Sequence, residues 1–333
     1  MSVQRILLCR GGALGDLILT LPVFAGIRSR WPNAHVCYAG YLPQGKLILA
    51  GDLADEFVSL DSADVAEWFA PDQQDGLACA EWLSSFNLVV TFIPDEDGLF
   101  RRRLERAGIR SILYRSPIVD VGHAADYFMG ILEGAAGSNQ DGTPTCAFPH
   151  LSLHADRVLV GRRMVENLGR RVIAMHPGSG SRRKNWPLRK FAELSTRVRE
   201  SGLGQPILVL GEAESDAEPV LQSLRCDTPV LKGIDITDLA GFLGACAAYV
   251  GNDSGVTHLA AALGIPVIGL FGGTDPAIWA PRGRHVHVLR RHECADGVPT
   301  LEVSEVLQAL QNLLCGAREH GQLSGYGYGG ESY

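Results

Sequence analysis

The segment Arg5-Ile6-Leu7-Leu8-Cys9-Arg10-Gly11-Gly12-Ala13-Leu14-Gly15-Asp16 decides the fold of this chain. It begins with a short apolar run that ends at glycines, a pattern that predicts a buried strand followed by a tight turn. Apolar residues then recur at helical spacing, at Leu17, Leu21, Phe24 and Ile27, until Trp31-Pro32-Asn33 ends the helix. A strand, a glycine turn and a helix in this order indicate the first βαβ unit of a doubly wound parallel sheet.

The same alternation continues along most of the chain. In the first half we expect strands over residues 35–39, 57–60 and 88–92 and helices over residues 78–84 and 99–107. In the second half we expect strands over residues 172–175, 207–210, 249–250 and 266–271 and helices over residues 188–199, 217–224, 239–247, 255–263 and 301–314. The stretch from Gly134 to Pro144 between them is rich in Gly, Pro and polar residues, which is typical of a connection between domains.

This pattern predicts an α/β protein with two Rossmann-like domains, residues 1–150 and 151–318. Their parallel sheets are expected to face a central cleft, because ligands of open α/β sheets bind beyond the carboxyl ends of the strands. Residues 319–333 contain Gly-Tyr repeats without a packing pattern, and we expect this tail to be disordered.

Composition and charge exclude several classes of protein. A net charge of -7 is unlike that of a nucleic-acid binder with a broad basic face. No apolar run reaches the ~20 residues of a membrane-spanning helix, and no signal peptide is recognisable, so we expect a cytoplasmic protein. Peripheral association with the inner face of the cytoplasmic membrane stays compatible with the sequence. The eight cysteines lack zinc-type spacing and are predicted to be reduced, buried thiols.

Asp16 is the candidate catalytic residue of the first half. It follows Gly15 at the expected start of a helix, where the helix dipole favours an anion. A carboxylate at this place can accept a proton from a substrate hydroxyl, and its alternative role is to cap the helix. The loop does not match a dinucleotide fingerprint, because GxGxxG would require glycine where Arg10 stands.

Loops that follow expected strands in the second half carry groups that bind nucleotides. Residues 176–187 supply hydroxyls, small residues and a cation for a diphosphate, with Ser179, Gly180, Ser181 and Lys184 as candidates. Residues 211–216 supply acids that could hydrogen-bond ribose, and either Glu214 or Asp216 fits this role.

A third loop precedes an expected helix and offers it a phosphate site. Asp253 and Ser254 can cap that helix while the amides of Gly255 and Val256 remain free for a phosphate. His258 either reaches this site or is a buried histidine with a structural role.

These residues resemble glycosyltransferase family 9, the ADP-heptose:lipopolysaccharide heptosyltransferases, over roughly residues 3 to 290. The shared motifs occur in the family's order: Gly15-Asp16, Thr20-Leu21-Pro22, Trp31-Pro32-Asn33-Ala34, His123-x-x-Asp126-Tyr127, His176-Pro177-Gly178, Lys184-x-Trp186-Pro187, Asn252-Asp253-Ser254-Gly255-x-x-His258-Leu259-Ala260-Ala261-Ala262-Leu263-Gly264-x-Pro266 and Phe271-Gly272-x-Thr274-Asp275-Pro276. The resemblance implies a GT-B fold and an inverting sugar transfer that uses neither metal nor cofactor.

The resemblance also implies roles for single residues. Asp16 corresponds to the catalytic base and Lys184 to the lysine that binds the diphosphate. Asp253, Ser254 and Gly255 correspond to the loop that contacts phosphate and sugar. The expected partners are a nucleotide-sugar donor, with ADP-heptose as the leading candidate, and a saccharide or lipid-linked saccharide acceptor.

Acceptor contacts are expected from the first half, at Gly15, Arg101 and Arg102. The alternative for the arginine run 101–103 is a solvated helix face. Asp95-Glu96-Asp97 has the DxD form that holds a divalent cation on a diphosphate elsewhere, so a metal-dependent reaction is a rival hypothesis. Other rivals are a nucleotide-sugar epimerase or hydrolase, a non-catalytic sugar-binding or assembly protein and, more remotely, a dehydrogenase.

Overall fold

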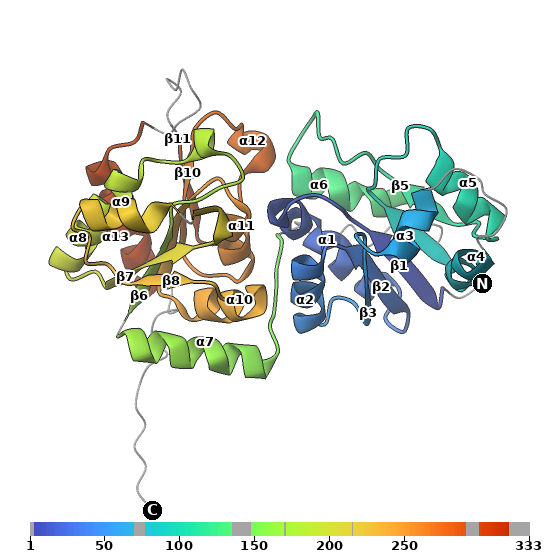
Figure 1. The fold of residues 1–333 in the computed structure, drawn as a ribbon, viewed down its shortest axis with the longest axis horizontal. Coiled ribbons are helices and arrows are strands. Elements are labelled where there is room, and N and C mark those ends of the chain that lie inside the picture. The colour runs from blue at the N-terminus through green and yellow to red at the C-terminus, as the bar shows by residue number, and fades with distance from the viewer. Residues whose placement is uncertain are drawn as a thin grey trace, which may run out of the picture. The chain divides into compact units, whose positions relative to one another are not determined.

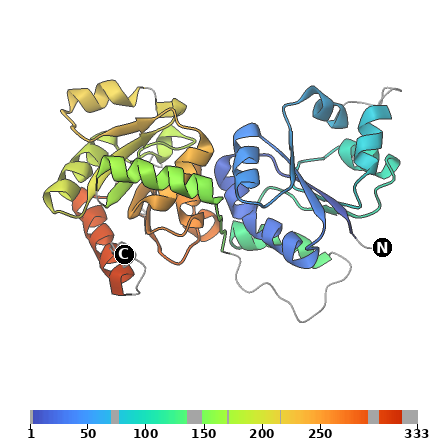
Figure 2. The same cartoon turned by 90° about the horizontal axis from the view of Figure 1, so that it is seen from below.

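The computed structural model describes residues 3–69, 77–134, 148–169, 171–214, 216–290 and 300–319. The chain forms two compact units, the first made chiefly of residues up to Arg157 and the second chiefly of residues from Val158 onward. Each unit is a parallel sheet with helices on both faces (Figures 1 and 2). Except for Gly134 and Glu319, the predicted connection from Gly134 to Pro144 and the predicted tail lie outside the described residues.

The sheet of the first unit has its switch point beside β1. Its strand order is β3-β2-β1-β4-β5, and every neighbouring pair is parallel. The chain therefore builds outward from β1 in one direction and then returns to build outward through β4 in the other. The strands are β1 (Arg5–Cys9), β2 (His35–Gly40), β3 (Glu56–Ser59), β4 (Leu88–Thr91) and β5 (Ile112–Tyr114).

Helices cover both faces of this sheet because its strands are apolar on both sides. On one face, Leu7, Cys9 and Val89 pack with an aromatic cluster in which Trp68 stacks on Phe100 at a centroid distance of 5.8 Å. Figure 1 shows α1 and α2 on the other face. The helices are α1 (Leu14–Arg30), α2 (Leu42–Ala50), α3 (Ala63–Ala66), α4 (Leu77–Ser84), α5 (Leu99–Arg106) and α6 (Ala124–Met129), with short 3-10 helices at Glu67–Phe69 and Gly130–Gly134.

The sheet of the second unit repeats this plan with one more strand. Its order is β11-β10-β9-β6-β7-β8, again with parallel neighbours, so the switch point lies between β6 and β9. The strands are β6 (Val172–His176), β7 (Gln205–Leu210), β8 (Val230–Lys232), β9 (Ala248–Asn252), β10 (Val267–Phe271) and β11 (Val286–Arg290).

The core of the second unit is built on its strand residues and on α8 and α13. Ile173 and Met175 pack with Trp186, Phe191 and Leu310, all of them at most 1% exposed. The helices are α7 (Ala155–Leu168), α8 (Leu188–Glu200), α9 (Ala217–Ser223), α10 (Ile236–Ala245), α11 (Gly255–Ala262), α12 (Pro276–Trp279) and α13 (Val303–Glu319), with 3-10 helices η3 (Arg182–Lys184) and η4 (Glu212–Glu214).

Every strand and helix expected from the sequence is present, with bounds that agree within a few residues except for α13, which continues to Glu319. The sequence did not predict the edge strands β5, β8 and β11, nor the helices α2, α3, α6, α7 and α12. No helix within the described residues is long and apolar enough to cross a membrane. The predicted cytoplasmic location stays a prediction.

The cysteine prediction is confirmed for three of the described thiols. Cys9, Cys37 and Cys246 are free and buried, and burial raises the pKa of the Cys37 thiol to about 12. Cys226 is half-buried and Cys315 is exposed, so the prediction of burial is wrong for Cys315, which lies near the end of α13.

Candidate active site

Asp16 lies in the first turn of α1, which follows the carboxyl end of β1 after a loop of residues 10–13. One of its oxygens, Oδ2, accepts the backbone N–H of Ala13 at 2.8 Å and so caps the helix. The other, Oδ1, lies 3.3 Å from Nη2 of Arg10. The side chain is still 30% exposed. Asp16 therefore has the capping role considered from the sequence and also keeps lone pairs that a solvent-borne hydroxyl can reach.

The glycine loop before Asp16 is fixed by side chains from the next strand and helix. Gly12 has a φ of +93°, and a Cβ atom built on it would lie 2.7 Å from Asp16 Oδ2. Only glycine combines this backbone conformation with so close an approach. Gln44 donates to the Gly12 carbonyl at 2.9 Å, and the Tyr38 hydroxyl donates to Gln44 Oε1 at 3.0 Å.

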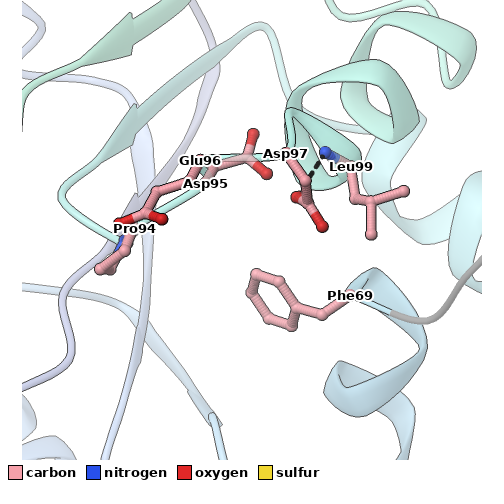
Figure 3. Close-up of a pocket in the computed structure, with 6 residues that line it drawn as sticks. All are labelled: Phe69, Pro94, Asp95, Glu96, Asp97 and Leu99. Carbon is pink, nitrogen blue, oxygen red and sulfur yellow. Dashed lines mark hydrogen bonds between the residues drawn. The ribbon is translucent and has the colours of Figure 1, made fainter.

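The acidic segment after β4 caps a helix. Asp95 accepts the backbone N–H groups of Phe100 and Arg101 at 3.0 and 2.9 Å, and Asp97 accepts that of Leu99 at 3.2 Å. With Phe69, Pro94, Glu96 and Leu99 these acids line a cavity of about 410 Å³ (Figure 3). Within the described ranges no three His, Cys, Asp or Glu side chains group as metal ligands. The capping bonds use both oxygens of Asp95 and one oxygen of Asp97, and the DxD hypothesis stays a prediction.

The arginines predicted to bind the acceptor have local partners on α5. Arg101 Nε pairs with Glu105 at 3.0 Å, and both side chains are more than half exposed. Arg102 donates to the carbonyl of Asp97 at 2.8 Å. Gly15 lies in the first turn of α1, next to Asp16. A role of Gly15, Arg101 and Arg102 in acceptor binding stays a prediction.

In the second unit, a buried asparagine fixes the loop that follows β6. Asn252 ends β9 and is fully buried. Its Nδ2 donates to the Pro177 carbonyl at 2.7 Å, and its Oδ1 accepts the backbone N–H of Trp186 at 2.9 Å. Because β6 and β9 are neighbours, one amide group can tie down both ends of the loop between Pro177 and Trp186.

Two of the predicted donor-binding residues meet at this switch point. Lys184 Nζ lies 2.8 Å from Asp253 Oδ2. Asp253 is 8% exposed at its side chain, whereas Lys184 is 40% exposed, so the ammonium group remains open to a further anion. Ser254 is the N-cap of α11 and accepts the backbone N–H of Thr257. The helix α11 thus begins two residues after the carboxylate that pairs with Lys184, and a helix N-terminus near a cation favours a phosphate.

The remaining donor-binding candidates lie on the loop after β6 and on α11. Ser179 Oγ lies 2.6 Å from Asn185 Oδ1 and 2.7 Å from the Ser181 carbonyl, which shapes the loop from within. A Cβ atom at Gly180 would meet nothing within 4 Å. His258 lies on α11 and is buried, with 5% of its surface exposed. Its predicted contact with the donor stays a prediction.

The structure separates the two acids proposed for ribose. Glu214 Oε2 accepts the Gly211 N–H at 2.7 Å, and a Cβ atom on Gly178 would lie 2.0 Å from Glu214 Oε1. Glu214 therefore lies against the loop after β6. Asp216 instead pairs with Arg182 at 2.6 Å, with both side chains more than half exposed. Of the two, Glu214 is the one that lies against the loop after β6, whereas Asp216 pairs with Arg182.

Sequence reasoning missed some residues that build this site. His176 ends β6, and its Nδ1 lies 2.9 Å from the Val209 carbonyl, so the proton is assigned to Nδ1. Burial lowers the pKa of His176, although the Val209 carbonyl and the charge of Glu214 act in the opposite direction. Asn252 and Arg10 were likewise not proposed as supporting residues. Their signal in the sequence is a polar residue directly at the carboxyl end of an apolar strand.

Comparison with known proteins identifies the second half of the chain. Residues 138–303 match the model of glycosyltransferase family 9 (heptosyltransferase). Over these residues the chain belongs to glycosyltransferase family 9. The resemblance seen in the sequence is thereby confirmed.

The family 9 relatives match in part. Lipopolysaccharide heptosyltransferase 1 of Pseudomonas aeruginosa is 33% identical over 113 residues, which are 34% of this chain and 32% of that protein. Lipopolysaccharide heptosyltransferase 3 of Escherichia coli is 27% identical over 172 residues, 46% of this chain and 50% of that protein. The chain thus spans one third to one half of the length of these curated relatives.

The fold matches over nearly the whole chain. The structure of E. coli ADP-heptose lipopolysaccharide heptosyltransferase II has a TM-score of 0.76 and 18% identity, and the match covers 95% of this chain and all of that one. This likeness confirms the predicted fold class, the GT-B arrangement of two Rossmann-like halves.

Proposed function

We propose that this chain transfers a heptose from ADP-heptose to a hydroxyl group of a lipopolysaccharide-core or related saccharide, with inversion at the anomeric carbon. The names of the family 9 relatives support the donor and acceptor classes. The observation that carries the proposal is the Lys184–Asp253 pair beside the start of α11. A half-exposed ammonium group near the first amides of a helix suits a diphosphate, the part that every nucleotide-sugar donor shares.

In this proposal the second unit binds the donor. Lys184 and the amide of Gly255 contact the diphosphate, and Asp253 and Ser254 contact phosphate and sugar. Glu214 accepts hydrogen bonds from the ribose hydroxyls. Ser179, Gly180 and Ser181 line the diphosphate on the loop after β6, and His258 supports the site from α11. The support for Glu214 over Asp216 is the pairing of Asp216 with Arg182.

The first unit supplies the base and the acceptor contacts. Asp16 takes the proton of the acceptor hydroxyl while that oxygen attacks the anomeric carbon. The bond from the anomeric carbon to the diphosphate breaks, and ADP leaves with the negative charge, which Lys184 and the helix amides stabilise. The reaction needs no metal in this scheme. Retention of full activity in EDTA is the expected result, and activity that vanishes with EDTA and returns with a divalent cation would favour the DxD alternative.

The proposal is tested by incubating the full chain with ADP-heptose and lipopolysaccharide-core saccharides. Mass spectrometry should detect an acceptor heavier by one heptosyl residue, together with free ADP. Asp16→Asn should lower kcat by about 10²–10⁴-fold, the range of a positioned general base, and leave the Kd of ADP unchanged in calorimetry. Free heptose formed with water as the only acceptor would indicate a hydrolase, and an altered nucleotide sugar would indicate an epimerase.

A matched control separates catalysis from helix capping. Glu305 accepts the backbone N–H of Glu302 at 2.7 Å, the same three-residue capping contact that Asp16 makes with Ala13. Glu305→Gln should lower the melting temperature about as much as Asp16→Asn and leave kcat unchanged. Binding of ADP-heptose without turnover in the wild-type protein would instead support a non-catalytic sugar-binding role.

Peripheral association with the cytoplasmic membrane is a separate prediction. Sedimentation of the full chain with vesicles that contain anionic lipid tests this location.

A thermal-shift series of nucleoside diphosphates tests the base of the donor, because a ligand that binds the native state raises its melting temperature. ADP should give the largest rise.

A further inference from the structure

Arg10 is a buried cation at the switch point of the first sheet. It follows β1 directly, and its side chain is 2% exposed. The guanidinium carbon lies 4.4 Å from the ring centroid of Phe128 on α6 and 5.5 Å from that of Phe92 after β4. Both rings therefore hold one face or edge of the cation in place.

A guanidinium group in such surroundings costs free energy to bury. Its Nε has no hydrogen-bond partner within the described part of the chain, and burial lowers the pKa of Arg10. The charged partner that faces it is Asp16, whose Oδ1 lies 3.3 Å from Nη2. An apolar side chain at this place would not carry the cost of burying a charge. The contact with Asp16 is the reason that the structure offers for a cation here.

The carboxylate of Asp16 is thus held at both oxygens. Ala13 N–H fixes Oδ2 and Arg10 fixes Oδ1, and a carboxylate has about four lone-pair sites, so two remain for a substrate. The rings of Phe92 and Phe128 hold the guanidinium group of Arg10 in place. Arg10 can therefore fix the plane of the Asp16 carboxylate. Such second contacts keep a reacting group in its productive geometry.

We propose that Arg10 is a positioning residue for Asp16, an inference that rests on the proposed sugar transfer. Arg10 does not contact the substrate. It holds the Asp16 carboxylate in the plane in which a free lone pair receives the proton of the acceptor hydroxyl. Displacement of a catalytic group by about 1 Å can cost ~10²-fold in rate, so the effect belongs in kcat rather than in donor affinity.

The test compares the two arginines at opposite ends of β1. Arg5 lies 4.9 Å over the ring of Phe86 and pairs with Glu56 at 2.7 Å, so it has the same kinds of contact as Arg10 but sits at the amino end of the strand. In the full chain, Arg10→Met should lower kcat about 10²-fold and leave the KM for ADP-heptose and the Kd of ADP within about two-fold. Arg5→Met should lower the melting temperature and leave kcat unchanged.

Two further variants keep the result decisive. Arg10→Lys restores a cation without the planar fork, and it should recover part of the lost kcat. Should Arg10→Met not fold, Arg10→Gln replaces it under the same criteria. If the wild-type protein is active and a folded Arg10→Met or Arg10→Gln variant has the same kcat, this inference is wrong and the proposed function is unaffected. An equal loss of kcat in Arg5→Met would also overturn this inference alone. Wild-type protein that transfers no sugar would reject the proposed function and this inference with it.

Discussion

Lys184 Nζ and Asp253 Oδ2 lie 2.8 Å apart although 69 residues separate the two in the chain. They follow β6 and β9, which the strand order makes neighbours at the switch point of the second sheet. The pair joins the loop after one strand to the start of the helix after the other. A diphosphate bound at this place would share Lys184 with Asp253.

Replacing Lys184 should affect ADP binding more than the stability of the fold. Lys184→Met should raise the Kd of ADP about 10-fold or more, because one charge-assisted hydrogen bond is lost. The unfolding free energy should fall by only about 1 kcal/mol, since Lys184 is 40% exposed and solvent screens the pair. Urea denaturation of Lys184→Met, Asp253→Asn and the double variant measures the coupling between them. An unchanged Kd of ADP in Lys184→Met would contradict the assignment.

A substitution in the glycine loop should disturb the base. Gly12→Ala places a Cβ atom 2.7 Å from Asp16 Oδ2 and forces an alanine to φ +93°. Gly108→Ala is the matched control, with φ +88° and open space around the new atom. Both should lose about 1–2 kcal/mol of stability to the left-handed conformation. Only Gly12→Ala should also lose transfer activity, and equal activities of the two variants would contradict the close approach.

The two acids after β7 should differ in nucleotide binding. Glu214→Gln should weaken ADP binding and leave binding of inorganic pyrophosphate unchanged, because ribose is present only in ADP. Asp216→Asn should change neither, since Asp216 pairs with Arg182 at an exposed position. Calorimetric titration of both ligands into both variants gives the comparison. A loss of ADP affinity confined to Asp216→Asn would reverse the assignment.

His176 should make stability depend on pH below neutrality. Burial lowers its pKa in the folded state, whereas the unfolded chain titrates near ~6.5. Below that value the unfolded state binds more protons than the folded state, so the unfolding free energy falls as the pH decreases towards the folded pKa. The slope contributed by one such group is at most about 1.4 kcal/mol per pH unit.

Urea denaturation between pH 8 and pH 5 checks this dependence. His176→Asn, which keeps an N–H for the Val209 carbonyl, should flatten the pH profile. His150→Asn, at an exposed position, should leave the profile as it is in the wild-type protein. Parallel profiles for wild type and His176→Asn would contradict the prediction.

The fold was predictable where strands are buried on both faces. β1, β6 and β10 contain such runs, and most of their side chains show as continuous apolar segments in the sequence. The missed strands are edges. Ile112–Tyr114 and Val230–Lys232 have three residues each and are partly exposed, so their composition differs little from that of loops.

For the candidate active site, the sequence predicted which loops carry it but not which side chains contact one another. Residues after strands could be named because the carboxyl ends of parallel strands share one edge of a sheet. The contact between Lys184 and Asp253 could not be named, because it requires that β9 return to lie beside β6. The surroundings of Arg10 could not be predicted either, because the rings that contact it belong to Phe92 and Phe128, far from it in the sequence. The sequence around it looks like an ordinary strand end.

The amide of Asn252 has a consequence for protein engineering. It anchors the loop at Pro177 and again at Trp186, so the strand holds both ends of the loop. Arg182 and Arg183, between the anchors, are exposed. A library randomised at these two positions can therefore search for altered nucleotide preference while Asn252 keeps both ends of the loop in place.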